Sequence, residues 1–125
     1  MPRVLVADDN DDSVEMLATF LGLFGYSVET ARDGQAALTA LEAAPADVAI
    51  LDLGMPRLDG YEVARRLVDQ PFRPALLIAL SGYSRDEDRR RTAEAGFDHH
   101  LVKPVDPERL HALIQEMLQA RGGGS

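Results

Sequence analysis

Short apolar segments recur five times along the chain, each followed by a polar break. Segments of this kind predict strands, and they fall at 3–7, 27–31, 48–51, 75–80 and about 97–102. The segment at 48–51 is wholly apolar, as expected of a central parallel strand that is buried on both faces. Polar and apolar residues alternate at 27–31, which indicates a strand nearer the edge of the sheet.

Helical periodicity fills the intervals between these strands. Apolar residues three and four positions apart predict helices at about 12–24, 34–44, 60–69, 85–95 and 107–118. The predicted starts carry residues typical of helix N-termini: Asp33, Asp59 with Glu62, Ser84 with Glu87, and Asp106 before Pro107. Five strand–helix repeats predict an α/β fold with a doubly wound parallel sheet, because right-handed crossovers place helices on both faces. Such sheets bind ligands beyond the carboxyl ends of their strands.

Composition and charge narrow the class of protein. The 125 residues suffice for one domain, which we expect at 1–120, with a flexible tail or linker at 121–125. The net charge of -8 disfavours direct binding to nucleic acid. No apolar run approaches the roughly 20 residues of a membrane span, and residues 1–20 show no secretory pattern, so we expect a cytoplasmic protein without membrane contact. The absence of cysteine excludes disulfides, thiolate metal sites and a cysteine nucleophile.

Polar side chains at the predicted strand ends would share one rim of the sheet. Asp8 and Asp9 follow the first strand, Asp52 the third, Ser81 the fourth and Lys103 the fifth. Crowded carboxylates require a raised pKa or a bound cation, and oxygen ligands favour Mg²⁺, which takes one or two carboxylates with phosphate oxygens. Asp52 is then a candidate nucleophile for acyl phosphate formation. Ser81 would donate a hydrogen bond to the phosphoryl group, and Lys103 would neutralise its charge.

Each of these residues has a simpler explanation when it is taken alone. Asp8 or Asp9 is more typical of a helix cap, and Asp52 of a strand end. Ser81 is more typical of a turn, and Lys103 of a solvated surface. Their joint placement at one rim is what favours a phosphoryl site.

Four motifs resemble those of response regulator receiver domains of bacterial two-component systems. They are Val-Ala-Asp-Asp-Asn at 6–10, Leu-Asp-Leu-Gly-Met-Pro-Arg-Leu-Asp-Gly at 51–60, Leu-Ser-Gly at 80–82 and Leu-Val-Lys-Pro at 101–104. The resemblance covers about residues 3–119 and implies a flavodoxin-like fold, with five parallel strands in the order 2-1-3-4-5 and five helices. It also implies phosphorylation-dependent signalling, with a sensor histidine kinase or histidine phosphotransfer domain as donor and an unknown output protein as partner.

The same resemblance implies roles for individual residues. Asp52 would accept the phosphoryl group from phosphohistidine, while Lys103 and Ser81 would contact it. The implied Mg²⁺ ligands are Asp9, Asp52 and the main-chain carbonyl of Gly54, with Asp8 binding through water. The peptide bond before Pro104 would be cis. Such a protein would catalyse its own phosphorylation and dephosphorylation without being a conventional turnover enzyme.

Three positions depart from the commonest receiver pattern. Ser81 replaces a more usual threonine but keeps the hydroxyl that switching needs. His100 stands where receivers often carry Tyr or Phe, so either a titratable ring couples switching to pH, or His100 simply packs or hydrogen-bonds at the surface. Gly54 offers no side chain to orient an attacking water, and Tyr83 offers no carboxylate or amide, which together predict slow loss of phosphate from Asp52.

The first predicted helix carries two apolar stripes. The core-facing stripe is Val14, Leu17, Ala18 and Leu21, and the second stripe is Met16, Phe20 and Leu23. The second stripe either packs against the last helix or docks a helix of the kinase's dimerisation bundle. The charged fourth helix is either a solvated face or an output surface. Similarity to receivers of hybrid sensor kinases at 81–91 and 96–104 leaves open whether the chain is a single-domain regulator or part of a longer protein.

Three other functions fit parts of the pattern. A phosphohydrolase of the haloacid dehalogenase class needs a second Asp two residues after the nucleophile, where this chain has Gly54. A flavin carrier of similar topology needs a hydroxyl-rich phosphate loop after the first strand, where acidic residues would repel the flavin phosphate. A phosphorylation-independent interaction module remains the alternative, although the complete acidic, hydroxyl and lysine set argues against it.

Overall fold

Parallel strands and helices alternate along the whole chain. The structure is a computed structural model that describes residues 2–82 and 86–122. The strands in this part are β1 (Arg3–Ala7), β2 (Ser27–Ala31), β3 (Val48–Asp52), β4 (Leu76–Ser81) and β5 (His99–Val102). The helices are α1 (Asp11–Leu23), α2 (Gly34–Ala43), α3 (Gly60–Leu67), α4 (Asp86–Ala95) and α5 (Pro107–Gly122). Every strand pair is parallel and the order is β2-β1-β3-β4-β5, which confirms the predicted doubly wound α/β fold.

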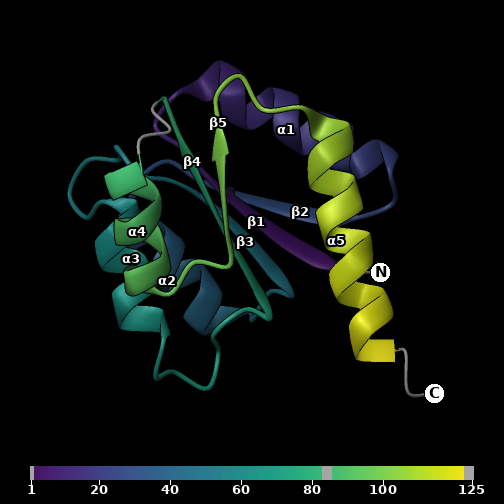
Figure 1. Cartoon of the computed structure of the whole chain (residues 1–125). Coiled ribbons are helices and arrows are strands. Elements are labelled where there is room, and N and C mark those ends of the chain that lie inside the picture. The colour runs from purple at the N-terminus through teal and green to yellow at the C-terminus, as the bar shows by residue number, and fades with distance from the viewer. Residues whose placement is uncertain (1, 83–85, 123–125) are drawn as a thin grey trace.

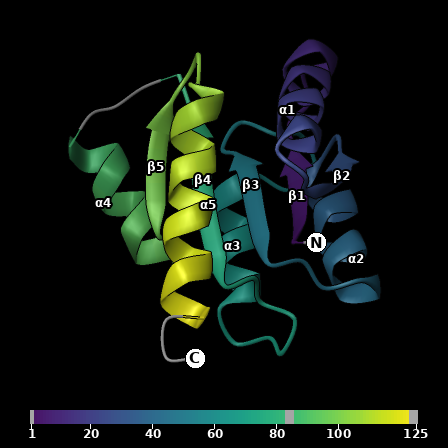
Figure 2. The same cartoon turned by 90° about the vertical axis from the view of Figure 1, so that its right-hand side faces the viewer.

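Helices cover both faces of the sheet (Figures 1 and 2). Alternate side chains of β1 point into opposite layers, as the pleat of a strand requires. Val4 and Val6 pack with residues of α1 and α5, whereas Leu5 and Ala7 pack with residues of α2, α3 and α4. Because both faces are covered, β3 is buried over its whole length, which explains its uniformly apolar sequence.

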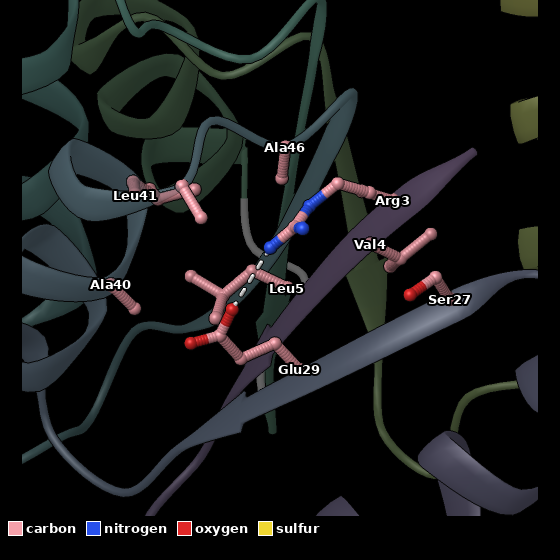
Figure 3. A pocket seen from close by; sticks show the side chains of 9 residues that line it. Arg3, Val4, Leu5, Ser27, Glu29, Ala40, Leu41 and Ala46 are labelled. Carbon is pink, nitrogen blue, oxygen red and sulfur yellow. Dashed lines mark hydrogen bonds and ion pairs between the residues drawn. The ribbon is translucent and has the colours of Figure 1, made fainter. Parts of the chain in front are cut away.

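The edge strand β2 differs from the central strands in both burial and charge. Of its residues only Ala31 is fully buried, which confirms the edge position indicated by its alternating sequence. At the amino end of the sheet, Arg3 and Glu29 form an exposed ion pair at 3.2 Å (Figure 3). The cavity beside this pair measures about 10 Å³, room for about one water molecule. It lies at the opposite end of the strands from the predicted site and is too small for a ligand.

Helix starts agree closely with the caps predicted from the sequence. The side chain of Asp33 accepts a hydrogen bond from the Ala36 N–H at 2.7 Å, and that of Asp59 accepts one from the Glu62 N–H at 2.9 Å. The predicted cap at Ser84 lies outside the described residues. Among the described helices, none combines the length and apolar composition needed to cross a bilayer.

Several element ends differ by two residues or more from the predicted ranges. Strand β5 begins at His99 and not at residue 97, because the main chain of residues 97 and 98 still connects α4 to the sheet: Phe97 N–H donates to the Thr92 carbonyl, and Asp98 N–H to the Leu77 carbonyl. Helix α5 continues to Gly122 and so includes the first two residues of the segment 121–125 that the sequence predicts as a tail or linker. Arg121 is helical and pairs with Asp47 at 3.1 Å. Residues 123–125 lie outside the described part.

Candidate functional site

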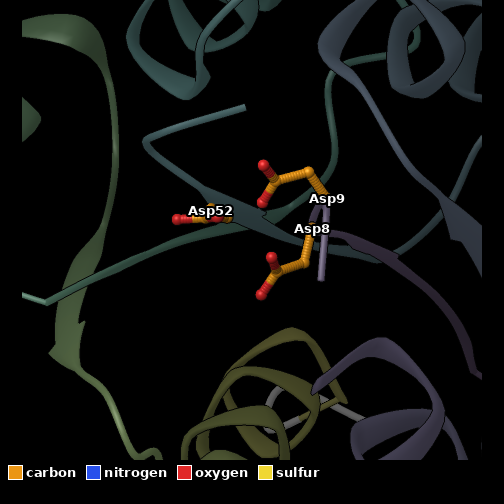
Figure 4. A group of neighbouring side chains, drawn as sticks. All are labelled: Asp8, Asp9 and Asp52. Carbon is orange, nitrogen blue, oxygen red and sulfur yellow. The ribbon is translucent and has the colours of Figure 1, made fainter. Parts of the chain in front are cut away.

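The carboxyl ends of β1 and β3 bring three carboxylates together. Asp8 and Asp9 directly follow β1, and Asp52 is the last residue of β3. The chain leaves β1 toward β2 on one side and later returns to β3 on the other, so the neighbouring ends of β1 and β3 form the topological switch point. Each of the three residues offers a carboxylate oxygen within 4.8 Å of the others (Figure 4). Asp8 and Asp52 are buried and Asp9 is exposed, so the group opens to solvent on one side.

A close backbone contact fixes the end of β3 beneath this group. Gly60, the first residue of α3, packs against the main chain of Asp52 and Leu53, and its N–H donates to the Leu53 carbonyl at 3.3 Å. A β-carbon at position 60 would lie only 2.7 Å from the Asp52 carbonyl oxygen. Glycine at this position therefore lets the start of α3 hold Asp52 in place.

Lys103 connects the carboxylates across the sheet. Its Nζ lies 2.9 Å from Asp8 Oδ2 and 3.3 Å from Asp52 Oδ2, although it follows β5 at the far edge. The peptide bond between Lys103 and Pro104 is cis, as the resemblance to receiver domains implies. Three carboxylates thus face one ammonium group, and the site keeps an excess of negative charge.

The ionisation of the group reflects this crowding. Burial and the neighbouring Asp8 side chain raise the pKa of Asp52, even though the Gly54 N–H donates to Asp52 Oδ1 at 3.3 Å. Burial also acts to raise the pKa of Asp8, but the Asn10 N–H at 3.0 Å and the Lys103 ammonium outweigh it, so that pKa is lowered. Burial acts to lower the pKa of Lys103, but the two carboxylates raise it overall. A divalent cation would relieve the remaining repulsion.

The donor set fits Mg²⁺. All the candidate ligands are oxygen atoms, and Mg²⁺ prefers oxygen ligands while it retains several waters. The exposed side chain of Asp9 and the exposed residue Gly54 leave one side of the group accessible to those waters. The structure thus brings Asp8, Asp9 and Asp52 together as predicted, with Gly54 in the adjoining loop.

A cleft of about 300 Å³ leads to Asp52. Its lining includes the predicted Ser81 and Gly54, and also Tyr61 of α3 with Asp88 and Arg91 of α4. The Arg91 guanidinium lies over the Tyr61 ring, 4.2 Å from its centroid. Burial raises the pKa of Tyr61, so its hydroxyl remains protonated. The sequence did not reveal Tyr61, Asp88 and Arg91 as part of this cleft. The spacing of Asp88 and Arg91 puts both on one face of α4, but it does not specify which element that face packs against.

His100 points inward and contacts Ser81. Both residues are 8% exposed, and Ser81 Oγ lies 2.7 Å from His100 Nε2. The other ring nitrogen of His100 lies 3.3 Å from Thr92 Oγ1 of α4. The interpretation of His100 as a surface residue is therefore wrong. Thr92 carried no signal in the sequence, because a threonine in a charged helix is ordinary.

The second stripe of α1 is solvent-accessible. Met16, Phe20 and Leu23 are 43%, 42% and 79% exposed, respectively. Leu17 and Leu21 of α1 share a buried cluster with residues of α5, and Phe24, which follows α1, stacks on His111 of α5 with ring centroids 4.0 Å apart. The second stripe thus remains a candidate docking surface.

Comparison with known proteins places this geometry in a family. The family model described as the response regulator receiver domain matches residues 4–115. An uncharacterized 14.6 kDa protein of Leptolyngbya boryana is 37% identical over 90% of this chain and 87% of its own length. The transcriptional regulatory protein PrrA of Mycobacterium tuberculosis is 40% identical over 97% of this chain, which spans 52% of that protein. The signal receiver domain of a signal transduction histidine kinase from Syntrophus aciditrophicus is 30% identical, with a TM-score of 0.87, over 96% of this chain and 92% of that one.

These matches agree with the fold and the rim of acidic residues. Receiver domains generally bind Mg²⁺ at an acidic pocket and interact with histidine kinases and output domains. The family model spans the five strands from Val4 onward and α5 as far as Gln115, so the match is to the domain and not to a single motif. The chain belongs to the response regulator receiver family.

Proposed function

We propose that this receiver accepts a phosphoryl group on Asp52 and uses the resulting change of its surface to signal to a partner. The observation that carries the proposal is the position of Lys103, whose ammonium lies within 3.3 Å of Asp52 and 2.9 Å of Asp8. A cation held there by two carboxylates is suited to neutralise a phosphoryl group formed on one of them. The proposed donor is a phosphohistidine of a sensor histidine kinase or histidine phosphotransfer domain.

The proposed transfer is a displacement at phosphorus. A carboxylate oxygen of Asp52 forms a bond to phosphorus, and the bond from phosphorus to the donor's imidazole nitrogen breaks, with its electron pair leaving on that nitrogen. Lys103 balances the charge of the transferred group, and Ser81, in the same cleft as Asp52, donates a hydrogen bond to it. The proposed Mg²⁺ ligands are Asp9, Asp52 and the carbonyl of Gly54, with Asp8 through water, and the ion would supply further positive charge.

The proposed setting of the protein follows from this chemistry. We propose a cytoplasmic location, where phosphohistidine donors of this class act, and the net charge of -8 argues against direct contact with nucleic acid. The chain spans about half the length of the transcriptional regulators that it resembles, so the activity of their remaining parts does not carry over. The output partner is therefore another protein or a further part of the same one.

Acetyl phosphate with Mg²⁺, followed by intact mass measurement, tests the proposal. The wild type should gain one phosphoryl group, and neither Asp52→Asn nor wild type in excess EDTA should gain it. Asp12→Asn is a matched control, because Asp12 is an exposed acid of α1 outside the carboxylate group, and it should be phosphorylated normally. A wild type without an adduct would overturn the proposal and favour an interaction module that works without phosphorylation.

A further inference from the structure

Three buried side chains form a hydrogen-bonded chain from α4 to the phosphoryl site. Ser81 Oγ lies 2.7 Å from His100 Nε2, and His100 Nδ1 lies 3.3 Å from Thr92 Oγ1. Thr92 Oγ1 in turn donates to the main-chain carbonyl of Arg89 at 2.9 Å. The three residues come from β4, β5 and α4, which lie side by side in both Figures 1 and 2. The three residues are only 2% to 8% exposed, so bulk water contributes little to their hydrogen bonding.

The direction of each hydrogen bond follows from the number of protons available. A hydroxyl carries one proton, and Thr92 commits its own to the Arg89 carbonyl. Thr92 can therefore only accept from His100, so Nδ1 of His100 must carry a hydrogen. In a neutral imidazole the other nitrogen is then an acceptor. Ser81 consequently donates its hydroxyl proton to His100 Nε2.

This direction conflicts with the role of Ser81 in the proposed function, on which the inference rests. With His100 neutral, the proton of Ser81 is directed at Nε2 and not at a phosphoryl oxygen. With His100 protonated, both ring nitrogens donate, Nε2–H donates to Ser81 Oγ, and the Ser81 proton turns to the phosphoryl group. We propose that phosphorylation of Asp52 is linked to uptake of one proton from solvent by His100, with Thr92 as the positioning residue that fixes the ring.

The resident charged groups around the three hydrogen-bonded side chains offset one another, so the charge added by phosphorylation decides which form of His100 is favoured. On α4, Asp88 favours a protonated imidazole and Arg91 opposes it, and both line the cleft that contains Ser81. At the strand ends, Asp52 and Lys103 form a close pair with opposite charges. A phosphoryl group on Asp52 adds negative charge to this same cleft, which favours the imidazolium form.

The resting protein provides the first test, independent of phosphorylation. At pH 8, the ¹⁵N chemical shifts of His100 should show hydrogen on Nδ1 in the wild type. Thr92→Val removes the acceptor with little change of shape and should increase the Nε2–H tautomer, whereas Thr92→Ser keeps the hydroxyl and should preserve the wild-type ring. A wild type with hydrogen on Nε2 would overturn the inference.

Beryllofluoride, which mimics a phosphoryl group on aspartate, provides the second test. Its affinity should be measured at pH 6 and pH 8 with Mg²⁺, for wild type and for His100→Phe. The effects of pH on Asp52 and on the metal are common to both proteins. The ratio of their two affinity changes between pH 8 and pH 6 therefore isolates the contribution of His100. Between pH 8 and pH 6 the wild type should gain about threefold more affinity than the variant, within the limit of about a hundredfold that one linked proton allows over two pH units. His100 should also titrate at higher pH in the adduct.

Thr92→Val provides the sharpest variant in this second test. This variant keeps the imidazole of His100. In it, the neutral Nε2–H tautomer of His100 can donate to Ser81 without proton uptake, so the effect of pH on beryllofluoride affinity should shrink toward that of His100→Phe. Equal pH responses of wild type and His100→Phe would overturn the linkage alone. A wild type that forms no adduct at either pH would overturn the proposed function as well.

Discussion

Residue 54 lies beside the proposed phosphoacceptor and has no side chain. It is exposed, and a β-carbon added there would meet no atom within 4 Å, so the position accepts a larger residue without strain. We expect Gly54→Asn to shorten the lifetime of the phosphorylated protein by roughly tenfold, because its amide would orient an attacking water. Decay of the adduct measured by intact mass would give the rate.

The control for this change is Gly54→Ala, which adds a β-carbon but no hydrogen-bonding group. It should keep the lifetime of the wild type. If the asparagine variant decayed no faster than the alanine variant, the absence of a side chain at position 54 would not explain slow loss of phosphate.

At the scale of elements, α1 combines a buried face with an exposed apolar one. Val14, Leu17 and Leu21 hold it against the sheet, while Phe20 at 42% exposed leaves apolar surface toward solvent. Phe20→Asp should lower the rate of phosphotransfer from a histidine kinase by about tenfold or more, because a charge in an apolar interface is costly to desolvate. The rate with acetyl phosphate should not change, since the carboxylate group is untouched.

Val68→Asp is the matched control for the α1 surface. Val68 is 46% exposed and follows α3, which packs on the opposite face of the sheet. This variant should retain phosphotransfer from the kinase. A Phe20 variant that lost both phosphodonors equally would indicate damage to the domain and not to a docking surface.

At the scale of the whole molecule, the carboxylate group affects global stability. The pKa of Asp52 is raised above its ordinary value of 3.8, so its contribution to stability is present below that pH and lost as pH rises through the folded pKa. The lowered pKa of Asp8 acts in the opposite sense, adding stability above pH 3.8 that is lost as pH falls. Asp52→Asn removes the pH-dependent contribution of Asp52 and leaves two of the three crowded carboxylates. In EDTA at pH 7, we expect it to raise Tm by about 4 °C, the shift that about 1 kcal/mol gives.

Thermal unfolding between pH 3 and pH 8 measures this effect. The advantage of Asp52→Asn over wild type should shrink toward pH 3, where the Asp52 carboxyl is protonated in both folded and unfolded states. Asp12→Asn, at an exposed position, should change Tm little over the same range. A lower Tm for Asp52→Asn than for wild type at pH 7 would show that Asp52 stabilises the metal-free fold.

The sequence by itself determined the alternation of strands and helices and the presence of Asp8, Asp9, Asp52, Ser81 and Lys103 at one rim. It could do so because parallel strands all end at the same edge of the sheet, so position along each strand is enough. Only the tertiary structure decided that Lys103 reaches Asp8 from the β5 edge of the sheet, that His100 turns inward to Ser81, and that α4 presents Thr92 to His100. These contacts depend on how the strands and one face of α4 pack against one another, and local periodicity does not specify which neighbour a side chain will meet.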